Sequence, residues 1–233
     1  MISNFFIVFY FPELLLGIGI LILILLSLFI KKNTFNNISL TSILLLFFVC
    51  ISVYYEKNIS FAFYEYLFKS SNFITFFKIL IIIGSIVSIS ISINFFNELK
   101  LKKFEIPILI LFSTLGMLVL ISSNNLMSMY LGIELQSLSL YIIAAINRDS
   151  LKSSEAGVKY FILGALSSGI LLYGCSLVYG FSGTSNFDEI KFVLSNNENL
   201  NIGMLFGLIF ILTGMAFKIS AVPFHMWAPD VYE

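Results

Sequence analysis

Three ionisable side chains lie inside stretches of sequence that are otherwise apolar: Glu134, Lys159 and Lys218. Placing one charge near the centre of a lipid bilayer costs about 3 kcal/mol, so three cost on the order of 9 kcal/mol. A carboxyl group and two amines can exchange protons with one another and with water. Ionisable groups inside a membrane therefore indicate an ion or proton path, and a simple membrane anchor has no reason to carry them.

Glu134 is the carboxyl group that we expect to lie deepest. It follows Leu126, the start of its apolar stretch, by eight residues, which is about 12 Å along a helix and near mid-membrane. Tyr130, Ser137 and Tyr141 would share its helix face and form a polar stripe, which is typical of a face turned to other helices or to water. Alternatively, Glu134 is a protonated carboxyl group that one hydrogen bond holds for packing alone.

Two interpretations of Lys159 remain open from its local pattern. Glu155 precedes it by four residues, a spacing at which Glu and Lys form a favourable helical pair at a wet surface. Otherwise Lys159 belongs with the intramembrane charges, although its expected depth argues against a direct ion pair with Glu134. Small residues would let a neighbouring helix approach the same helix face closely: Gly157, Gly164 and Ser168.

The sequence after Lys218 predicts a broken helix. Pro223 cannot donate to the helix ladder and would clash with the carbonyl group of Ile219, so the helix should kink or break near there. Broken helices occur at membrane depth where they are buried in protein or line a water-filled cavity. His225, the only histidine, suits a proton relay because imidazole protonates near neutral pH. Alternatively, His225 is an interfacial residue beside Trp227, in the aromatic belt of the membrane.

Composition and hydropathy predict an all-α, polytopic membrane protein. The chain is 59% hydrophobic and 11% charged, with a mean hydropathy of +1.00, whereas about a quarter of a soluble domain is charged. Thirteen basic residues balance thirteen acidic ones, so there is no positive field for nucleic acid. Because about 20 apolar residues cross a bilayer as a helix, seven stretches qualify: Leu14–Ile30, Ile38–Tyr55, Phe73–Ile93, Ile106–Ile121, Leu126–Ile146, Ala156–Phe181 and Leu200–Val222.

Basic residues concentrate in every second loop, which predicts the orientation of the chain. One set of loops holds seven basic residues and the opposite set holds three, so the N-terminus is expected outside. Lys78, near the outer end of its span, is expected to reach the interface by snorkelling and to need no further role. Glu13 is likewise expected near the outer boundary. The two sets of loop residues are Lys31, Lys32, Lys100, Lys102, Lys103, Arg148 and Lys152 against Lys57, Lys69 and Lys191.

The sequence carries no pattern that is typical of a redox or hydrolytic centre. There is no glycine-rich nucleotide loop of the usual spacing, no cysteine cluster for iron–sulfur and no histidine pair for haem. Cys50 and Cys175 lie far apart in apolar runs and are expected to serve in packing. We therefore expect no cofactor and no metal in this chain, and any redox chemistry must take place in other subunits.

Three segments carry a resemblance to a known family: YLGIELQSLS at Tyr130–Ser139, EAGVKYF at Glu155–Phe161 and FKISAVPFHMWAPDVYE at Phe217–Glu233. Together with Pro12-Glu13-Leu14, they resemble the subunit N family of proton-translocating NADH–quinone oxidoreductase, respiratory complex I, called NADH dehydrogenase subunit 2 in mitochondria. The resemblance extends over the whole chain.

The resemblance implies an antiporter-like, proton-pumping module of the membrane arm. Glu134 and Lys218 would form the pumping pair on a broken helix, with Lys159 and His225 on the same hydrophilic axis. NADH, flavin, iron–sulfur clusters and quinone would be bound by other subunits. The partners would be other membrane-arm subunits and the lipid bilayer, in a bacterial cytoplasmic membrane or a mitochondrial inner membrane.

The chain departs from this family in its length. We expect three N-terminal transmembrane helices over residues 1–105 and the first part of the antiporter-like repeat over 106–233. The family continues with a second, inverted repeat, so the chain is expected to be a fragment or one part of a split subunit, unable to pump alone. Two other functions stay open: a subunit of a related cation/proton antiporter or membrane-bound hydrogenase, and a purely structural membrane subunit.

Overall fold

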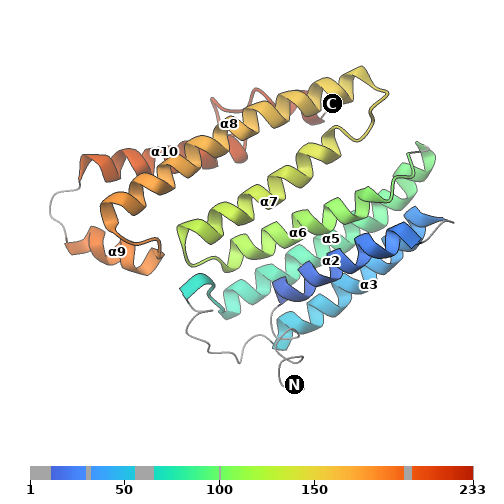
Figure 1. Ribbon diagram of the computed structural model, residues 1–233, viewed down its shortest axis with the longest axis horizontal. Helices are drawn as coiled ribbons and strands as arrows, with labels where there is room; N and C mark the ends of the chain where they lie inside the picture. The colour runs from blue at the N-terminus through green and yellow to red at the C-terminus, as the bar shows by residue number, and fades with distance from the viewer. Residues whose placement is uncertain (1–11, 30–32, 56–65, 100, 197–200, 233) are drawn as a thin grey trace. The chain divides into compact units, whose positions relative to one another are not determined.

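The computed structural model describes residues 12–29, 33–55, 66–99, 101–196 and 201–232 (Figure 1). Lys31, Lys32, Lys57 and Lys100, which contribute to the predicted orientation, lie outside the described residues, as do Ile30, Leu200 and Glu233. The helices are α2 (Pro12–Phe29), α3 (Thr34–Tyr55), α5 (Asn72–Glu98), α6 (Glu105–Ser122), α7 (Leu126–Ala144), α8 (Leu151–Ser182), α9 (Phe187–Asn196), α10 (Ile202–Lys218) and α11 (Ala228–Tyr232).

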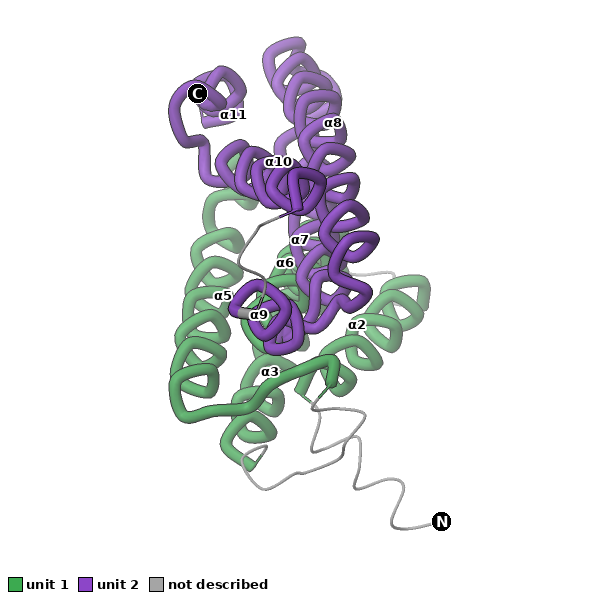
Figure 2. Tube along the Cα trace, turned by 90° about the vertical axis from the view of Figure 1, so that its left-hand side faces the viewer, with its two compact units in different colours: residues 1–122 green, residues 123–233 purple. Residues whose placement is uncertain are grey.

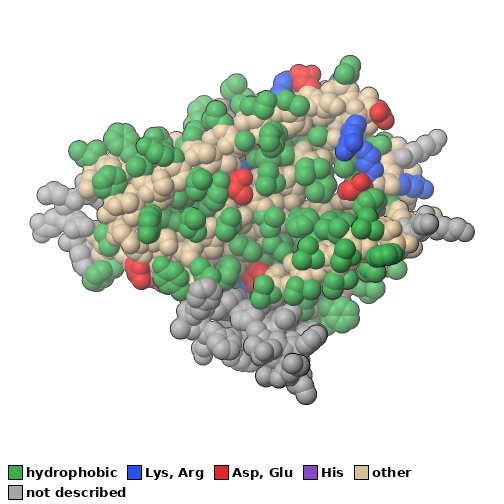
Figure 3. Space-filling model, in the orientation of Figure 1, with side chains coloured by type: hydrophobic (Ala, Val, Ile, Leu, Met, Phe, Trp, Pro, Cys, Tyr) green, Lys and Arg blue, Asp and Glu red, His purple; other side chains and the backbone are tan. Residues whose placement is uncertain are grey.

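Six of the described helices are long and apolar enough to cross a membrane: α2, α3, α5, α6, α7 and α8. The seventh predicted stretch forms α10, an apolar helix that ends at Lys218, four residues before the predicted end at Val222. Hydrophobic side chains cover the helix surfaces over the face in Figure 3, as expected where lipid is the solvent. The prediction of a polytopic helical membrane protein is confirmed.

The described chain divides into two compact units, residues 1–122 and 123–233 (Figure 2). In unit 1, α6 packs on α2, α3 and α5 around a core of aliphatic side chains that includes Leu16, Ile82 and Leu111. The sequence predicts a functional division between residues 105 and 106, which differs from this boundary between compact units. That functional division stays a prediction.

Six buried hydroxyl groups in the described part of unit 1 are satisfied within their own helices. Each donates a hydrogen bond to a carbonyl three or four residues earlier, as Ser42 does to Ile38 at 2.7 Å. Small hydroxyl residues let transmembrane helices approach closely, and the backbone bond satisfies the polar group in an apolar surrounding. The same pattern occurs at Ser39, Ser52, Ser85, Ser92 and Thr114.

The expectation for Lys78 is wrong. Its side chain is fully buried, with 0% exposed, and its Nζ lies 2.7 Å from Oε1 of Glu13, which is 10% exposed. The same carboxylate oxygen accepts a hydrogen bond from Ser122 at 3.0 Å. Lys78 does not extend to an interface because a carboxylate on α2 and the end of α6 surround it inside the unit.

In unit 2, α8 packs against both α7 and α10. Helices α8 and α10 lie side by side in Figures 1 and 2, and glycine makes this approach close. A methyl group added at Gly174 would meet the backbone of α10, and one added at Gly214 would meet Leu171. The short helix α9 was not predicted, and the backbone of Phe187 at its start donates to Asn124 beside the start of α7.

Candidate functional site

Helix α10 ends at Lys218 through a regular C-terminal motif. Ser220 takes a left-handed backbone conformation, with φ of 54°. The backbone N–H of Ala221 donates to the carbonyl of Ala216, and that of Ser220 donates to the carbonyl of Phe217, the two bonds of a Schellman ending. The predicted break is therefore present, and Pro223 lies in the non-helical segment beyond it.

The ammonium group of Lys218 contacts three hydroxyl groups. Nζ lies 2.8 Å from Oγ of Ser137, 3.0 Å from the phenol oxygen of Tyr141 and 3.0 Å from Oγ of Ser168. An ammonium group has three N–H donors, so these hydroxyls can accept all of them.

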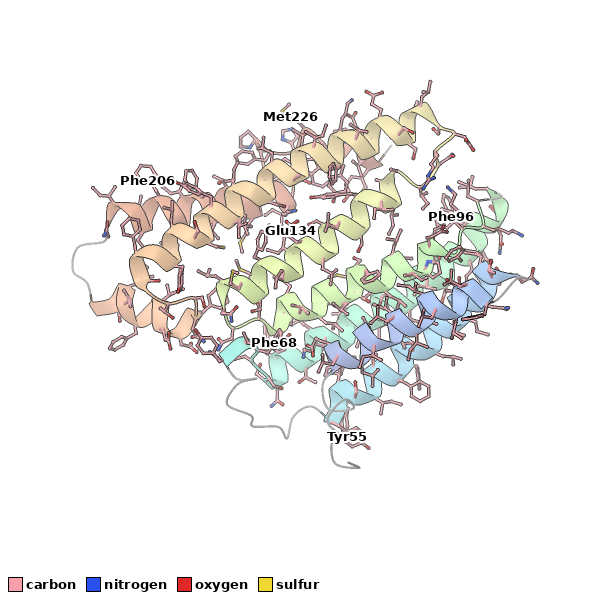
Figure 4. The ribbon with its side chains drawn as sticks, viewed as in Figure 1. Tyr55, Phe68, Phe96, Glu134, Phe206 and Met226 are labelled. Atoms are coloured by element: carbon pink, nitrogen blue, oxygen red, sulfur yellow. The ribbon has the colours of Figure 1, made fainter. Side chains whose placement is uncertain are left out.

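Glu134 lies next to this cluster, midway along α7 (Figure 4). Its Oε1 is 3.8 Å from Nζ of Lys218, close enough for an ion pair and too long for a hydrogen bond. The side chains of Lys218 and Glu134 are 17% and 20% exposed in this chain. Oε1 is itself buried and has no hydrogen-bond partner among the described residues. The carboxylate thus lies beside a lysine whose donors are directed to hydroxyls.

The helical spacing predicted for α7 brings these groups together. Ser137 and Tyr141, three and seven residues after Glu134, both contact Lys218, so this part of the predicted polar stripe faces another helix. The place of Tyr130 in the stripe stays a prediction. The Tyr141 ring packs edge-on against Tyr160 of α8, with 4.5 Å between ring centroids. Gly164 leaves room for the phenol, because a methyl group at that position would overlap the Tyr141 hydroxyl.

Lys159 is part of a second ion-pair group. Its Nζ lies 2.7 Å from Glu155, which confirms the predicted helical pair, and 2.8 Å from Oδ2 of Asp230 on α11. The Lys159 side chain is 44% exposed. The carboxylates recorded at Lys159 are therefore those of Glu155 and Asp230, and Glu134 instead pairs with Lys218.

The segment after α10 folds back onto α8 through Trp227. This indole is buried and stacks on Tyr160, with ring centroids 4.4 Å apart and planes 13° apart. Its Nε1 donates to the carbonyl of Phe217 at 3.3 Å. His225 lies in the turn before α11, where its side chain is exposed.

Sequence reasoning missed two members of these groups. Ser168 was predicted only as a small residue at a helix contact, and its position nine residues after Lys159 carries no signal for a lysine on α10. Asp230 lies in the motif that follows Lys218, but no role was assigned to it. The sequence did offer a signal for Asp230, because it is an acidic residue that follows the predicted helix break by a few residues and lies in the first turn of α11.

Chemically, unit 2 presents a lysine, a carboxyl group and hydroxyls that both donate and accept hydrogen bonds. Protons can move between such groups without a metal or a redox centre.

Residues 123–233 match the model of a family described as the NADH:quinone oxidoreductase/Mrp antiporter transmembrane domain. Over 95% of its length, the chain is 50% identical to NADH-quinone oxidoreductase subunit N of Bartonella bacilliformis. Over these residues the chain is similar to this family.

The match to subunit N recurs among other members of the family. Subunit N of Pelagibacter ubique is 50% identical over 97% of the chain, and one from Rhizobium meliloti is 47% identical over 95%. These alignments cover 45%, 47% and 46% of the three relatives, so the chain spans about half the length of the curated relatives it matches. The resemblance to subunit N is confirmed for the part of the relatives that the chain covers.

Solved structures show the same family fold. A chain of respiratory complex I from Thermus thermophilus matches 95% of this chain with a TM-score of 0.76 and 26% identity, over 47% of its own length. The archaeal membrane-bound sulfane sulfur reductase matches with a TM-score of 0.74 at 21% identity, which shows the fold alone. The Mrp complex from Dietzia matches with a TM-score of 0.73 at 17% identity.

Proposed function

We propose that this chain is part of a proton-translocating, membrane-arm subunit of NADH–quinone oxidoreductase. The observation that carries the proposal is the position of Lys218, at the end of a broken helix, with its ammonium group 3.8 Å from Glu134. Support also comes from subunit N relatives at 50% identity. In this proposal, quinone reduction takes place elsewhere, and the chain converts the resulting electrostatic change into proton transfer.

The proposed mechanism is electrostatic. The ammonium of Lys218 is held by hydroxyls of Ser137, Tyr141 and Ser168 while the carboxylate of Glu134 remains just beyond hydrogen-bonding distance. A charge that approaches or leaves this cluster changes the relative energies of the protonated and neutral lysine, because charges interact strongly where water is scarce. The proton that Lys218 releases passes to an acceptor along the polar axis, and the lysine is later reprotonated.

Further parts of the proposal rest on the resemblance. NADH, flavin, iron–sulfur clusters and quinone would be bound by other subunits, and the partners would be other membrane-arm subunits. The membrane would be a bacterial cytoplasmic membrane or a mitochondrial inner membrane, with the N-terminus outside. The resemblance also assigns a proton-carrying role to Lys159 and His225, although both side chains lie outside the group of contacts around Lys218.

The test replaces Lys218 in the subunit as it exists in its assembled complex. Lys218→Ala should abolish proton pumping in membrane vesicles while the complex still assembles on native gels. Glu134→Gln, which keeps size and removes the charge, should lower pumping in the same assay. Lys191→Ala, at an exposed lysine on α9, is the matched control. Normal pumping by assembled Lys218→Ala would refute the assignment of Lys218.

A second candidate function is supported by the shared fold. The Mrp complex and the sulfane sulfur reductase both contain a chain of this fold, so a subunit of a related cation/proton antiporter is the alternative. Quinone-dependent NADH oxidation in membranes that contain the protein would support the first proposal. Sodium/proton exchange without NADH oxidation would support the second, and unchanged activity after substitution of all three charges would favour a structural subunit.

A further inference from the structure

Two neighbouring residues of α8 hold the segment that follows the break. Lys159 forms an ion pair with Asp230 at 2.8 Å, and Tyr160 stacks on Trp227. Both contacts join the beginning of α8 to residues 227–230, which lie beyond the end of α10. The non-helical segment therefore begins at the last turn of α10 and is held on α8 at its C-terminal end by these two contacts.

Trp227 contacts the surroundings of Lys218 from two directions. Its indole N–H donates to the carbonyl of Phe217, the residue immediately before Lys218. Its stacking partner Tyr160 packs edge-on against Tyr141, whose phenol accepts a hydrogen bond from Lys218. A displacement of Trp227 would thus shift both the backbone that carries the lysine and one hydroxyl that holds its ammonium group.

We propose that Asp230 and Trp227 are positioning residues for Lys218, and that Lys159 is the anchor for Asp230 and not a proton carrier. This inference rests on the proposed function, because it assigns how the end of α10 is held for that reaction. The contacts of Lys159 with Asp230 and of Tyr160 with Trp227 act together as a latch, which keeps the segment after the break on α8.

The charge environment of Lys159 agrees with an anchor. Two carboxylates lie within 2.8 Å of its ammonium group, one on its own helix and one on α11. Its ion pairs share no residue with the pair of Lys218 and Glu134. An ion pair with these two carboxylates requires the charged form of the lysine, whereas proton carriage requires it to become neutral during each cycle.

The latch is expected to have a moderate effect. Ion pairs between partly exposed side chains favour the paired state by roughly two- to fivefold. Loss of the Asp230 charge should therefore slow pumping by about two- to fivefold, in contrast to the complete loss expected for Lys218→Ala. Removal of Lys159 should have the same effect as removal of Asp230, and the double variant should be no worse than either.

The deciding variant is Lys159→Arg in the assembled complex. An arginine side chain keeps the positive charge for both carboxylates but does not lose its proton in proteins. An anchor predicts proton pumping per NADH oxidised close to that of the unmodified complex, whereas a proton carrier predicts its loss. Asp230→Asn should lower pumping, and Asp230→Glu should restore most of it because the carboxylate is kept.

Glu155→Gln is the matched control, since it removes the partner of Lys159 on the same helix and leaves the Asp230 pair in place. We expect it to pump normally. Loss of pumping in Lys159→Arg, or normal pumping in Asp230→Asn, would overturn the latch. Lys218→Ala tests the proposed function separately, because this variant keeps the contacts of the latch. Every pumping rate is normalised to the amount of assembled complex on native gels. If Asp230→Asn assembles poorly, Lys159→Arg remains the test that decides between an anchor and a proton carrier.

Discussion

The ammonium group of Lys78 lies 2.7 Å from the carboxylate of Glu13, in the interior of unit 1. The two residues come from α5 and α2, and Ser122 at the end of α6 donates to the same carboxylate. Buried ion pairs contribute little net stability compared with apolar residues of the same size, but removal of one partner leaves an uncompensated charge. The stable packing of α2 in the unit therefore depends on α5, and that of α5 depends on α2.

A double-mutant cycle tests this dependence. Lys78→Met and Glu13→Gln should each reduce the amount of assembled complex and its thermal stability, by about 3–5 kcal/mol when a partner is removed from a buried pair. The double variant Glu13→Gln/Lys78→Met should recover most of the loss, because no buried charge remains. Thermal unfolding of the complex in detergent measures the effect. A double variant as unstable as the sum of the single variants would contradict the buried pair.

Tyr141→Phe should slow proton pumping by roughly ten- to a hundredfold, because a hydrogen bond to a charged group is worth roughly 1.5–3 kcal/mol. The phenyl ring keeps the edge-on contact with Tyr160, so assembly should be normal. Pumping in vesicles measures the change. Tyr179→Phe, at an exposed tyrosine on α8, is the control. Equal pumping by the two variants would exclude a role for the Tyr141 hydroxyl.

Gly164→Ala should impair pumping because the added methyl group overlaps the Tyr141 hydroxyl. Overpacking of this kind costs about 1–3 kcal/mol, and the phenol has to move away from Lys218 to relieve it. Gly169→Ala is a close control, since nothing lies within 4 Å of a methyl group at that position on the same helix. Thermal stability and pumping are both measured. Indistinguishable behaviour of the two variants would show that the phenol position does not matter.

Trp227→Phe should reduce pumping by roughly two- to tenfold, which corresponds to the loss of one neutral hydrogen bond. The substitution removes the indole N–H that donates to Phe217 and keeps an aromatic ring against Tyr160. Phe206→Leu, at an exposed aromatic residue of α10, controls for general changes in that helix. Pumping and native-gel assembly are measured together, and a normal rate would argue against this hydrogen bond as a constraint on Lys218.

Local patterns predicted the parts of the site that lie on one helix. The positions of Ser137 and Tyr141 relative to Glu134 follow from helical periodicity, and the structure confirms that both face Lys218. The Glu155–Lys159 pair follows from the same spacing. The end of α10 near Lys218 follows from the backbone chemistry of Pro223, although the helix stops several residues before the proline.

Contacts between distant helices could not be predicted in this way. Lys78 was assigned to an interface because its depth was judged from α5 alone, whereas Glu13 on α2 decides its position. Ser168 and Asp230 reach their lysines only after α8 packs against α10 and α11. A search for opposite charges at similar depths from the same membrane side would have found Glu13 and Lys78.

The hydroxyl groups in unit 1 have a consequence for biogenesis. Because Ser39, Ser85 and Thr114 donate to carbonyls of their own helices, each helix can enter lipid one at a time with these groups already satisfied. Glu13 and Lys78 form an ion pair across two helices, so the burial of either charge inside the unit depends on both α2 and α5. The unit thus contains hydroxyl groups that each helix satisfies by itself and an ion pair that forms only when two helices have come together.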